Sequence, residues 1–363
     1  MLKKKNIFFN KSFLIYGLGK SGISSFLFLK KNNEVDAYDD NNKLSINKKI
    51  KKSIIKLNEV GKKNYDFIVI SPGIDIKKCK LKNYLSKNLI KIVTDLDVFY
   101  SKYRNNKNIV ITGTNGKSTC VKLIFNILKD HKKDVRLVGN IGNPVLSERN
   151  IDLKTIFVIE ASSYQIEYSR FFKAKYAAIL NITPDHLERH GNFNNYAQAK
   201  FKLIKNQEKR TFSFVDLNSP YINKFIKKNR LNSKIIKIKK NSIKTKLNYI
   251  KNKLFLTQGN IQNLSFVFAI IKKLNLNAKK TLNTINNFKG LKFRQEIIFK
   301  AKNLTIINDS KATSFSSSEN ILKSLKNVYW ILGGIPKKGD KFQMTRKECN
   351  SFKAYIFGNN KSF

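Results

Sequence analysis

The chain has 363 residues, and 41% of them are hydrophobic, which is enough for two or three packed domains. Its formal net charge of +48 is typical of nucleic-acid-binding proteins. Only nine of the 72 basic residues are arginines, however, and the lysines are scattered among many Asn, Ile and Phe residues. Direct readers of bases usually use arginine. We therefore expect no nucleic-acid partner, although a positive field favours anionic substrates at low salt.

Two further features of the sequence indicate the cellular compartment of the protein. No apolar run reaches the ~18 residues needed to cross a bilayer, and the basic start of the chain carries too short an apolar segment for a signal peptide. Cys79, Cys120 and Cys349 are far apart and odd in number, so neither a disulfide framework nor a zinc site fits. These features predict a cytoplasmic protein with no stable membrane insertion.

Residues 12–40 predict a strand, a glycine-rich loop, a helix and a second strand that ends in Asp39 and Asp40. The loop, Gly17-Leu18-Gly19-Lys20-Ser21-Gly22, and the acidic residues match a Rossmann-like phosphate loop with a ribose contact. The first turn of any tightly wound parallel sheet is an alternative, and so is the cofactor loop of an NAD-dependent dehydrogenase. Further strands are expected at 65–74 and 90–95, before a polar linker at 102–107.

The run Thr112-Gly113-Thr114-Asn115-Gly116-Lys117-Ser118-Thr119 carries the strongest functional signal. It follows an apolar strand, residues 108–111, and precedes residues 120–128, which are apolar at helical spacing. In a strand–loop–helix unit, backbone N–H groups and the helix N-terminus converge on a polyphosphate. Lys117 would reach the terminal phosphates, and Ser118 or Thr119 would hold Mg²⁺. The run therefore predicts ATP binding; a glycine turn capped by Ser or Thr is the alternative.

Two near-continuous apolar runs, residues 155–160 and 176–181, predict parallel strands that are covered on both faces. Glu160 closes the first strand, and Asp185 and His186 follow the second. A carboxylate and a histidine at neighbouring strand ends can share a divalent cation; a helix cap and a loop hydrogen bond are the plainer alternatives. Beyond a Lys/Asn-rich surface segment at 227–253, we expect strands at 235–238, 304–309, 328–332 and 354–358, and helices at 263–274 and 316–325.

Five motifs, in order along the chain, resemble those of the Mur ligases, the ATP-dependent amino-acid ligases of bacterial cell-wall synthesis. They are Thr112–Thr119, Gly139–Pro144, Glu160–Gln165, Asn181–His186 and Tyr196–Lys200. The resemblance implies an α/β fold of three domains. These are a Rossmann-like N-terminal domain (1–103), a central P-loop ATPase-like domain with a parallel sheet (104–291) and a C-terminal Rossmann-like domain (292–363).

Four more motifs look like those of the D-glutamate-adding branch of this family: Gly17–Gly22, Ser71–Ile74, Asn308–Thr313 and Gly333–Lys337. The resemblance implies that the chain uses ATP and Mg²⁺ to add D-glutamate to UDP-N-acetylmuramoyl-L-alanine. The reaction would pass through an acyl phosphate and would serve peptidoglycan precursor synthesis. We expect a bacterial cytoplasmic monomer whose partners are small molecules. Another Mur ligase, above all the L-alanine-adding one, is the alternative.

The same resemblance assigns the site residues. The UDP-substrate would contact Gly17, Gly19, Lys20, Ser21, Asp39 (or Asp40), Gly73, Asn140 and His186. ATP would contact Gly113, Thr114, Asn115, Gly116, Lys117, Ser118, Thr119, Asn260, Arg294, Asp309 and Lys311. The metal ligands would be Ser118, Glu160, His186 and Lys200, the last after carbamylation by CO₂. Thr313 and Lys337 would contact D-glutamate, and catalysis would depend on Lys117, Glu160, His186, Lys200 and Arg294.

The chain departs from the family pattern in three places. Gly259 stands where a histidine usually precedes Asn260, and Phe293 stands where a histidine usually precedes Arg294. Members of the family also continue beyond the last predicted strand and supply a serine and an aromatic residue to the glutamate site. We therefore expect a C-terminally incomplete product. An inactive fragment is one alternative, and a natural short form completed by another chain is the other.

Overall fold

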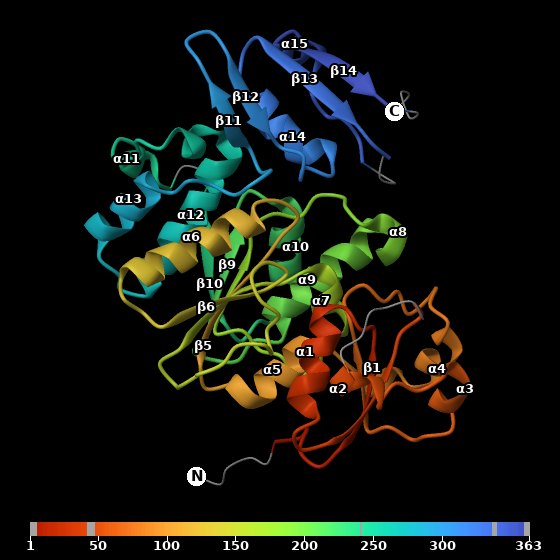
Figure 1. Cartoon of the computed structure of the whole chain (residues 1–363). Helices are drawn as coiled ribbons and strands as arrows, with labels where there is room; N and C mark the ends of the chain where they lie inside the picture. The colour runs from red at the N-terminus through yellow and green to blue at the C-terminus, as the bar shows by residue number, and fades with distance from the viewer. Residues whose placement is uncertain (1–5, 42–47, 240–241, 336–339, 359–363) are drawn as a thin grey trace.

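The computed structural model describes residues 6–41, 48–239, 242–335 and 340–358. Three α/β regions follow one another from the bottom to the top of Figure 1. We call them the N-terminal region (β1 to α5), the central region (β5 to α13) and the C-terminal region (β11 to β14). Within the described part of the chain, no helix combines the length and the apolar character that crossing a bilayer requires.

The N-terminal region is built on a parallel four-stranded sheet in the order β2-β1-β3-β4. The strands are β1 (Ser12–Tyr16), β2 (Glu34–Tyr38), β3 (Phe67–Ile70) and β4 (Ile92–Val93), and the helices are α1 (Lys20–Leu29), α2 (Lys48–Lys51), α3 (Leu57–Val60), α4 (Lys82–Lys87) and α5 (Asp95–Tyr103). Gly17 precedes α1 with φ +92°, and a Cβ there would lie 2.8 Å from the Ser71 Cβ. The close approach of the loop to the end of β3 therefore requires glycine.

The central region is a six-stranded sheet in the order β10-β9-β8-β5-β7-β6, and all its pairs are parallel. The strands are β5 (Lys107–Thr112), β6 (Val135–Gly139), β7 (Ile156–Glu160), β8 (Tyr176–Ile179), β9 (Phe212–Asp216) and β10 (Lys234–Ile238). The helices are α6 (Lys117–Asp130), α7 (Ser163–Tyr168), α8 (Leu187–His190), α9 (Phe193–Lys205), α10 (Pro220–Lys228), α11 (Lys244–Leu247), α12 (Gln258–Lys273) and α13 (Ala278–Asn286).

Hydrophobic side chains cover both faces of this sheet, because successive residues of a strand point to opposite sides. Ile109 and Ile111 of β5 belong to a cluster with side chains of α6, α12 and α13. Val110 belongs to a second cluster, which contains α9 side chains and also Phe13 of β1. In this second cluster, Phe99 of α5 meets Phe157 of β7 edge to face, with ring centroids 4.8 Å apart. The N-terminal and central regions therefore share one continuous core.

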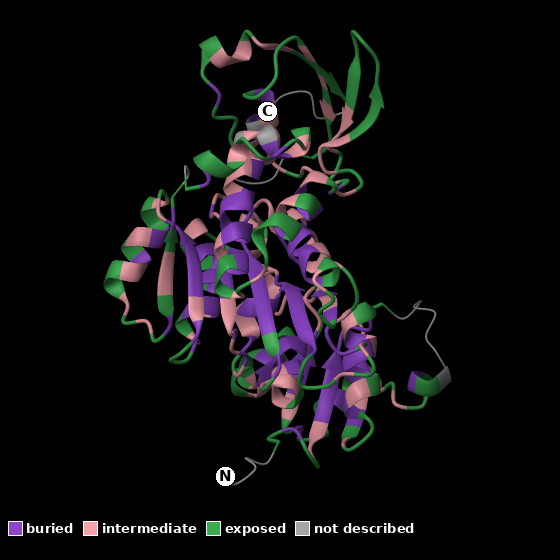
Figure 2. Cartoon of the chain, turned by 90° about the vertical axis from the view of Figure 1, so that its left-hand side faces the viewer, coloured by how far each residue is buried: buried purple, intermediate pink, exposed green. Residues whose placement is uncertain are grey.

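The C-terminal region contains two separate two-stranded sheets. The strands β11 (Glu296–Lys300) and β12 (Thr305–Asn308) pair antiparallel, and β13 (Val328–Gly333) and β14 (Phe352–Phe357) pair parallel; α14 (Phe315–Leu322) and α15 (Arg346–Cys349) complete the region. Among its described residues only Glu319, Leu322 and Met344 are buried. Figure 2 shows the contrast, with buried residues concentrated in the strands of the other two regions.

Most predicted elements are confirmed, with four differences. The strand expected at 90–95 is only Ile92–Val93, because residues 89–91 form a 3₁₀ turn and α5 starts at Asp95. The linker expected at 102–107 shrinks to 104–106, between α5 and β5. The helix expected from 263 already begins at Gln258. The strands β6, β9 and β11 and the helices other than α1, α6, α12 and α14 were not predicted. The domain boundaries at 103 and 291 stay predictions; they fall at the end of α5 and between α13 and β11.

Candidate active site

The predicted phosphate loop joins β5 to α6 at the carboxyl edge of the central sheet. Gly113 has φ +154° and Gly116 has φ +84°, conformations that other residues rarely adopt. A Cβ on Gly116 would lie 2.2 Å from Oδ1 of Asn263, so a larger residue there would displace the Asn263 side chain of α12. The first turn of α6 consequently presents its N–H groups at this edge, which is the arrangement that binds phosphate.

Asn181, just beyond β8, holds this loop in place. Its Oδ1 accepts hydrogen bonds from the backbone N–H groups of Thr114 (3.1 Å) and Asn115 (2.8 Å), and its Nδ2 donates to the Asn115 carbonyl (3.0 Å). One side chain therefore fixes two consecutive residues of the loop. The sequence predicts no role for Asn181 within its motif, because a contact across 66 residues leaves no local signal.

Two lysine side chains converge on the carbonyl of Gly113. Lys117 Nζ donates to it at 2.9 Å and to the Thr114 carbonyl at 2.7 Å. Lys200 Nζ, on α9, also donates to the Gly113 carbonyl at 2.9 Å and is 2% exposed. Burial, followed by the charge of Lys117, holds the pKa of Lys200 well below its ordinary value. Far more of Lys200 is therefore the neutral, nucleophilic amine than in an exposed lysine.

Glu160 ends β7 beside the phosphate loop, in register with Ile111 of β5. It is 1% exposed, and its Oε1 accepts a hydrogen bond from Nδ2 of Asn140 at 2.7 Å. Its buried Oε2 has no hydrogen-bond partner among the described residues, a costly arrangement unless a cation or a donor joins it. The same residues include no cluster of three or more His, Cys, Asp or Glu that could hold a metal. A cation at Glu160 would therefore draw its other ligands from hydroxyl, phosphate or modified-lysine oxygens.

His186 opens α8 in a left-handed conformation with φ +53°. Its Nε2 lies 3.4 Å from Oδ2 of Asp185, and its ring packs against the Tyr164 ring of α7 at 5.1 Å. His190, at the other end of α8, was not predicted as a site residue. Its Nε2 lies 3.0 Å from Ser163 Oγ, and burial lowers its pKa to about 4. His190 is therefore neutral at physiological pH and stiffens the aromatic surface behind His186.

A cavity of about 500 Å³ lies between the N-terminal and central regions. We call it the glycine-loop cavity; its walls are Gly17, Gly19, Lys20, Ser21, Asp39, Ser71, Pro72, Gly73, Ile74, Gly139, Asn140 and Gln165. It brings together every residue predicted to bind the UDP-substrate except His186. Asp39 lines the cavity and accepts the Leu18 N–H at 2.6 Å, whereas Asp40 accepts the Tyr16 hydroxyl at 2.9 Å. This placement favours Asp39 over the alternative, Asp40.

Three of the remaining residues predicted for ATP lie where α12 meets the C-terminal region. Asn260, 8% exposed, donates to the Leu254 carbonyl at 2.8 Å and to Gln295 Oε1 at 3.3 Å. Asp309 accepts the Gln295 N–H at 3.1 Å. Burial raises the pKa of Asp309 to about 6, against the opposing charge of Arg294. The structure therefore brings Asn260, Arg294 and Asp309 to one junction.

The residues predicted for the far side of the nucleotide and for D-glutamate lie beyond this junction. The Lys311 N–H donates to the Phe293 carbonyl at 3.0 Å, and its Nζ lies 5.8 Å from the centre of the Phe293 ring. Thr313 is exposed, two residues before α14. Lys337 lies outside the described residues.

Comparison with known proteins matches the N-terminal and the central region to one family. The Mur ligase middle domain matches residues 111–287, and the N-terminal domain of MurD-like Mur ligases matches residues 11–94. UDP-N-acetylmuramoylalanine--D-glutamate ligase of Rickettsia prowazekii is 34% identical over 374 residues, which cover 96% of this chain and 82% of that protein. The chain belongs to the Mur ligase family. The ligase of the same name from Francisella tularensis subsp. novicida is 35% identical, over 81% of this chain and 69% of its own.

Solved structures of Mur ligases share the fold. MurF ligase from Thermotoga maritima, in complex with ADP, superposes with a TM-score of 0.58 at 13% identity, over 96% of this chain and 81% of that chain. A Neisseria ligase for L-alanyl-gamma-D-glutamyl-meso-diaminopimelate gives a TM-score of 0.53 at 12% identity, over 78% of this chain and 99% of that chain. The α/β fold class predicted from the sequence is therefore confirmed.

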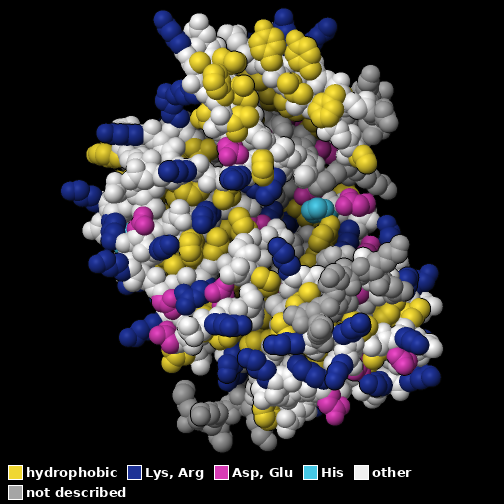
Figure 3. Space-filling model, in the orientation of Figure 1, with side chains coloured by type: hydrophobic (Ala, Val, Ile, Leu, Met, Phe, Trp, Pro, Cys, Tyr) yellow, Lys and Arg dark blue, Asp and Glu magenta, His cyan; other side chains and the backbone are white. Residues whose placement is uncertain are grey.

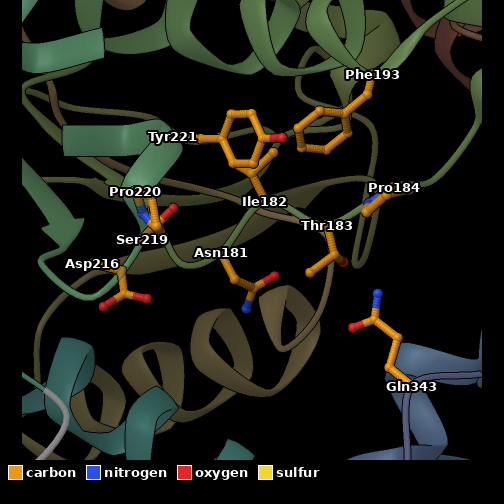
Figure 4. Close-up of a pocket in the computed structure, with 10 residues that line it drawn as sticks. All are labelled: Asn181, Ile182, Thr183, Pro184, Phe193, Asp216, Ser219, Pro220, Tyr221 and Gln343. Atoms are coloured by element: carbon orange, nitrogen blue, oxygen red, sulfur yellow. The ribbon is translucent and has the colours of Figure 1, made fainter. Parts of the chain in front are cut away.

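This Mur ligase has a second cavity, of about 580 Å³, that none of the predicted site residues lines. Its walls are Asn181, Ile182, Thr183, Pro184, Phe193, Asp216, Ser219, Pro220, Tyr221 and Gln343. In Figure 4 the Phe193 and Tyr221 rings meet at one side, and Gln343 reaches in from the C-terminal region. The cavity lies at the carboxyl ends of β8 and β9, so it opens at the same sheet edge as the phosphate loop.

A polar contact joins the phosphate loop of this Mur ligase to α14 of the C-terminal region. Ser317 Oγ donates to Asn115 Oδ1 at 2.7 Å, and Asn115 Nδ2 lies 3.4 Å from Ser316 Oγ. The N-cap residue of α14, Ser314, makes no side-chain cap and instead hydrogen-bonds both serines. The predicted ATP loop and the predicted D-glutamate region therefore meet through serine and asparagine side chains.

Proposed function

We propose that this Mur ligase uses ATP to add D-glutamate to UDP-N-acetylmuramoyl-L-alanine, as a monomer in the bacterial cytoplasm, in peptidoglycan precursor synthesis. The observation that carries the proposal is the 2.7 Å hydrogen bond from Asn140 to Glu160. Asn140 lines the glycine-loop cavity, and Glu160 lies beside the phosphate loop. The cavity proposed for the acceptor and the loop proposed for ATP therefore share one edge.

The reaction is carboxylate activation followed by amide formation. An oxygen of the alanyl carboxylate attacks the γ-phosphorus of ATP, the bond to the ADP oxygen breaks, and an acyl phosphate forms. The D-glutamate amine then attacks the acyl carbon and loses a proton, and the tetrahedral intermediate expels phosphate. Lys117 and Arg294 offset the charge that moves with the phosphoryl group. Positioning and electrostatics carry this chemistry, and no side chain needs to act as a nucleophile.

The residues around Glu160 fit a magnesium ion. The unpartnered, buried Oε2 of Glu160 supports this assignment, since Mg²⁺ prefers carboxylate, hydroxyl and phosphate oxygens. Ser118 and Glu160 would hold one ion, and His186 with a carbamylated Lys200 would hold a second. When bound, Mg²⁺ neutralises charge on the phosphate oxygens.

Lys200 is suited to carbamylation by its burial. Its depressed pKa favours the neutral amine, whose lone pair can attack the carbon of CO₂. An N–C bond forms as one C–O π bond of CO₂ opens, one proton leaves to water, and the neutral amine becomes a carbamate with two oxygen ligands. The desolvation that makes a lysine ammonium unfavourable here thus favours its conversion into a group that a metal ion can neutralise.

The remaining assignments extend from the phosphate loop. Residues 113–119 would wrap the ATP phosphates, and Asn260, Asp309 and Lys311 would complete the nucleotide site. Thr313 and Lys337 would hold D-glutamate, since a hydroxyl and an ammonium suit its carboxylate.

The test is phosphate release by the purified chain with UDP-N-acetylmuramoyl-L-alanine, ATP and Mg²⁺. We expect release that requires D-glutamate and that L-alanine, offered with UDP-N-acetylmuramate, does not support. Lys117→Met should abolish it, whereas Lys129→Met, an exposed position on the same helix, should not. Release that ignores D-glutamate, or that follows L-alanine, would overturn the proposal.

A further inference from the structure

Arg189 of α8, in the central region, forms hydrogen bonds to the N-terminal region. Its Nη1 donates to the Pro72 carbonyl at 3.1 Å, and its Nη2 donates to the Ile74 carbonyl at 2.5 Å. Both carbonyls belong to the turn that follows β3, and the Ile74 N–H closes that turn on the Ser71 carbonyl at 3.0 Å. One guanidinium therefore bridges two carbonyls of a turn that lies 115 to 117 residues away in the chain.

This turn shapes the glycine-loop cavity. Ser71, Pro72, Gly73 and Ile74 all line it. Ser71 Oγ also donates to the Gly17 carbonyl at 2.6 Å, so the turn is coupled to the adjacent glycine loop, which lines the same cavity. Any shift of the turn would change the width of the cavity.

The Arg189 guanidinium also lies over the ring of Tyr164, with Cζ 4.1 Å from the ring centre. The same ring packs against His186 at 5.1 Å and stacks on the buried His190 at 5.4 Å. A cation over an aromatic face is attractive, more so where water is excluded. Arg189 therefore touches both the wall of the cavity and the aromatic support of His186.

The chemistry of this contact calls for arginine. The planar fork of a guanidinium can donate to two carbonyl oxygens while its flat face stacks on the ring. A lysine ammonium can also donate to two carbonyls, as Lys117 does, but it has no flat face to stack on Tyr164. The chain uses lysine for most of its 72 basic residues, so an arginine at this position is an exception to its own composition.

We propose that Arg189 is a positioning residue that sets the distance between the glycine-loop cavity and His186, and so presents the acceptor's carboxylate to the phosphate loop. This inference rests on the proposed function. Arg189 contacts backbone carbonyls and Tyr164 rather than the reacting atoms. It acts by fixing two regions that each contribute one half of the acceptor site.

The first test measures binding by calorimetry for the wild type, Arg189→Lys and Arg189→Met, with Arg170→Lys as the matched control. Arg170 also lies over an aromatic ring, that of Phe171 at 5.1 Å, but it is exposed and does not line the glycine-loop cavity. Loss of charged hydrogen bonds predicts that both Arg189 variants bind UDP-N-acetylmuramoyl-L-alanine about tenfold more weakly. ADP binding should stay within about twofold, and Arg170→Lys should match the wild type for both ligands.

Two further readouts separate positioning from a merely structural role. Added guanidinium ion should partly restore acceptor binding to Arg189→Ala, because it can refill the space between the carbonyls and the ring. Hydrogen exchange at the Ile74 N–H should accelerate in Arg189→Met but not in Arg170→Lys. Unchanged acceptor binding together with unchanged exchange at Ile74 would overturn the inference.

The exchange measurement also separates the two proposals. A wild-type chain that binds no UDP-N-acetylmuramoyl-L-alanine would refute the proposed function. The exchange rate at the Ile74 N–H alone would then test the coupling of Arg189 to the cavity wall: faster exchange in Arg189→Met would support it, and an unchanged rate would refute it.

Discussion

The central region and the C-terminal region differ in how far their strands are buried in a hydrophobic core. Strands β5, β7 and β8 are almost completely buried, whereas β13 and β14 leave large apolar side chains in contact with solvent. Tyr329 is 68% exposed, Ile331 73% and Phe357 61%. In Figure 3 such side chains gather at the top of the molecule, over the C-terminal region, while lysines and arginines spread over the rest of this face.

The two regions also differ in how they hold the residues of the candidate site. Glu160 and Lys200 are 1% and 2% exposed and sit on elements fixed by two hydrophobic clusters. Asp309, in contrast, is held through the Gln295 N–H, and α14 touches the phosphate loop through Ser317 and Asn115. The packed half of the site is therefore pre-organised by its core, and the other half is tethered by polar contacts that can exchange with water or ligand.

The largest expected effect is on catalysis in the packed half. Lys200→Met should lower D-glutamate-dependent phosphate release by about 100- to 1000-fold, because it removes the amine that would carry the carbamate. Lys205→Met, an exposed position on the same helix, should leave the rate unchanged. A methionine fills the buried space of Lys200, so circular dichroism should show a folded protein. A Lys200→Met variant that kept more than a tenth of the activity would refute the role of Lys200.

The same substitution in the two regions should have very different costs. Ile159→Ala, in β7 at 0% exposure, should lower the free energy of unfolding by about 2 to 5 kcal/mol, the range for a cavity in a packed core. Ile331→Ala, in β13 at 73% exposure, should change it by less than about 0.5 kcal/mol. Urea unfolding followed by far-ultraviolet circular dichroism compares the two. Equal losses would show that the C-terminal sheets are packed as tightly as the central one.

Protonation offers a third comparison, since burial raises the pKa of both Asp95 and Asp309 to about 6. Asp95, under the glycine-loop cavity, accepts from Gln165 Nε2 and is 2% exposed. A carboxyl whose folded pKa exceeds its unfolded pKa of about 3.8 stabilises the fold below that pH. This contribution is lost as the pH rises to about 6.

Replacing Asp95 should therefore reduce the pH dependence of the free energy of unfolding. From pH 4 to pH 7, the stability of Asp95→Asn relative to the wild type should rise by up to about 3 kcal/mol. The corresponding rise for Asp309→Asn should be smaller, because Asp309 is partly exposed and solvent screens its charge. Urea midpoints at several pH values measure both. A relative stability of Asp95→Asn that stays constant with pH would contradict the raised pKa.

The smallest effect is expected at the tether. Ser317→Ala removes the 2.7 Å hydrogen bond to Asn115 and should cost about 1 kcal/mol. The only tryptophan, Trp330, lies on β13, so its fluorescence reports on the C-terminal region. We expect a lower urea midpoint by fluorescence and an unchanged one by circular dichroism. Ser310→Ala, at an exposed position, is the control. An equal shift of its urea midpoint would show that the Ser317–Asn115 hydrogen bond does not stabilise the C-terminal region.

The sequence predicted what local patterns can encode. Glycine spacing located both predicted phosphate loops, and apolar runs located the strand that ends in Glu160 and the strand that precedes His186. Because parallel strands end at one edge, the sequence could also predict that these residues meet the phosphate loop. The prediction of the UDP-substrate residues rested on family resemblance, and the structure places all but His186 of them around the glycine-loop cavity.

Sequence analysis missed the residues whose partners lie far away in the chain. Asn181 binds the loop at Thr114, Arg189 binds the carbonyl of Pro72, and Asn115 meets Ser317 over a separation of 202 residues. A polar side chain in a loop looks the same in sequence whether it faces solvent or a distant backbone. Only the packing of the sheets against one another decides which of these contacts form.

The most direct measurement follows oxygen from the acceptor. UDP-N-acetylmuramoyl-L-alanine with ¹⁸O in its alanyl carboxylate is incubated with the chain, ATP, Mg²⁺ and D-glutamate, and the released phosphate is analysed by mass spectrometry. If the carboxylate attacks ATP and the amine then displaces phosphate, each phosphate released carries one ¹⁸O atom from the acceptor. Phosphate that forms with D-glutamate present but carries no ¹⁸O would contradict the acyl-phosphate route and with it the proposed function.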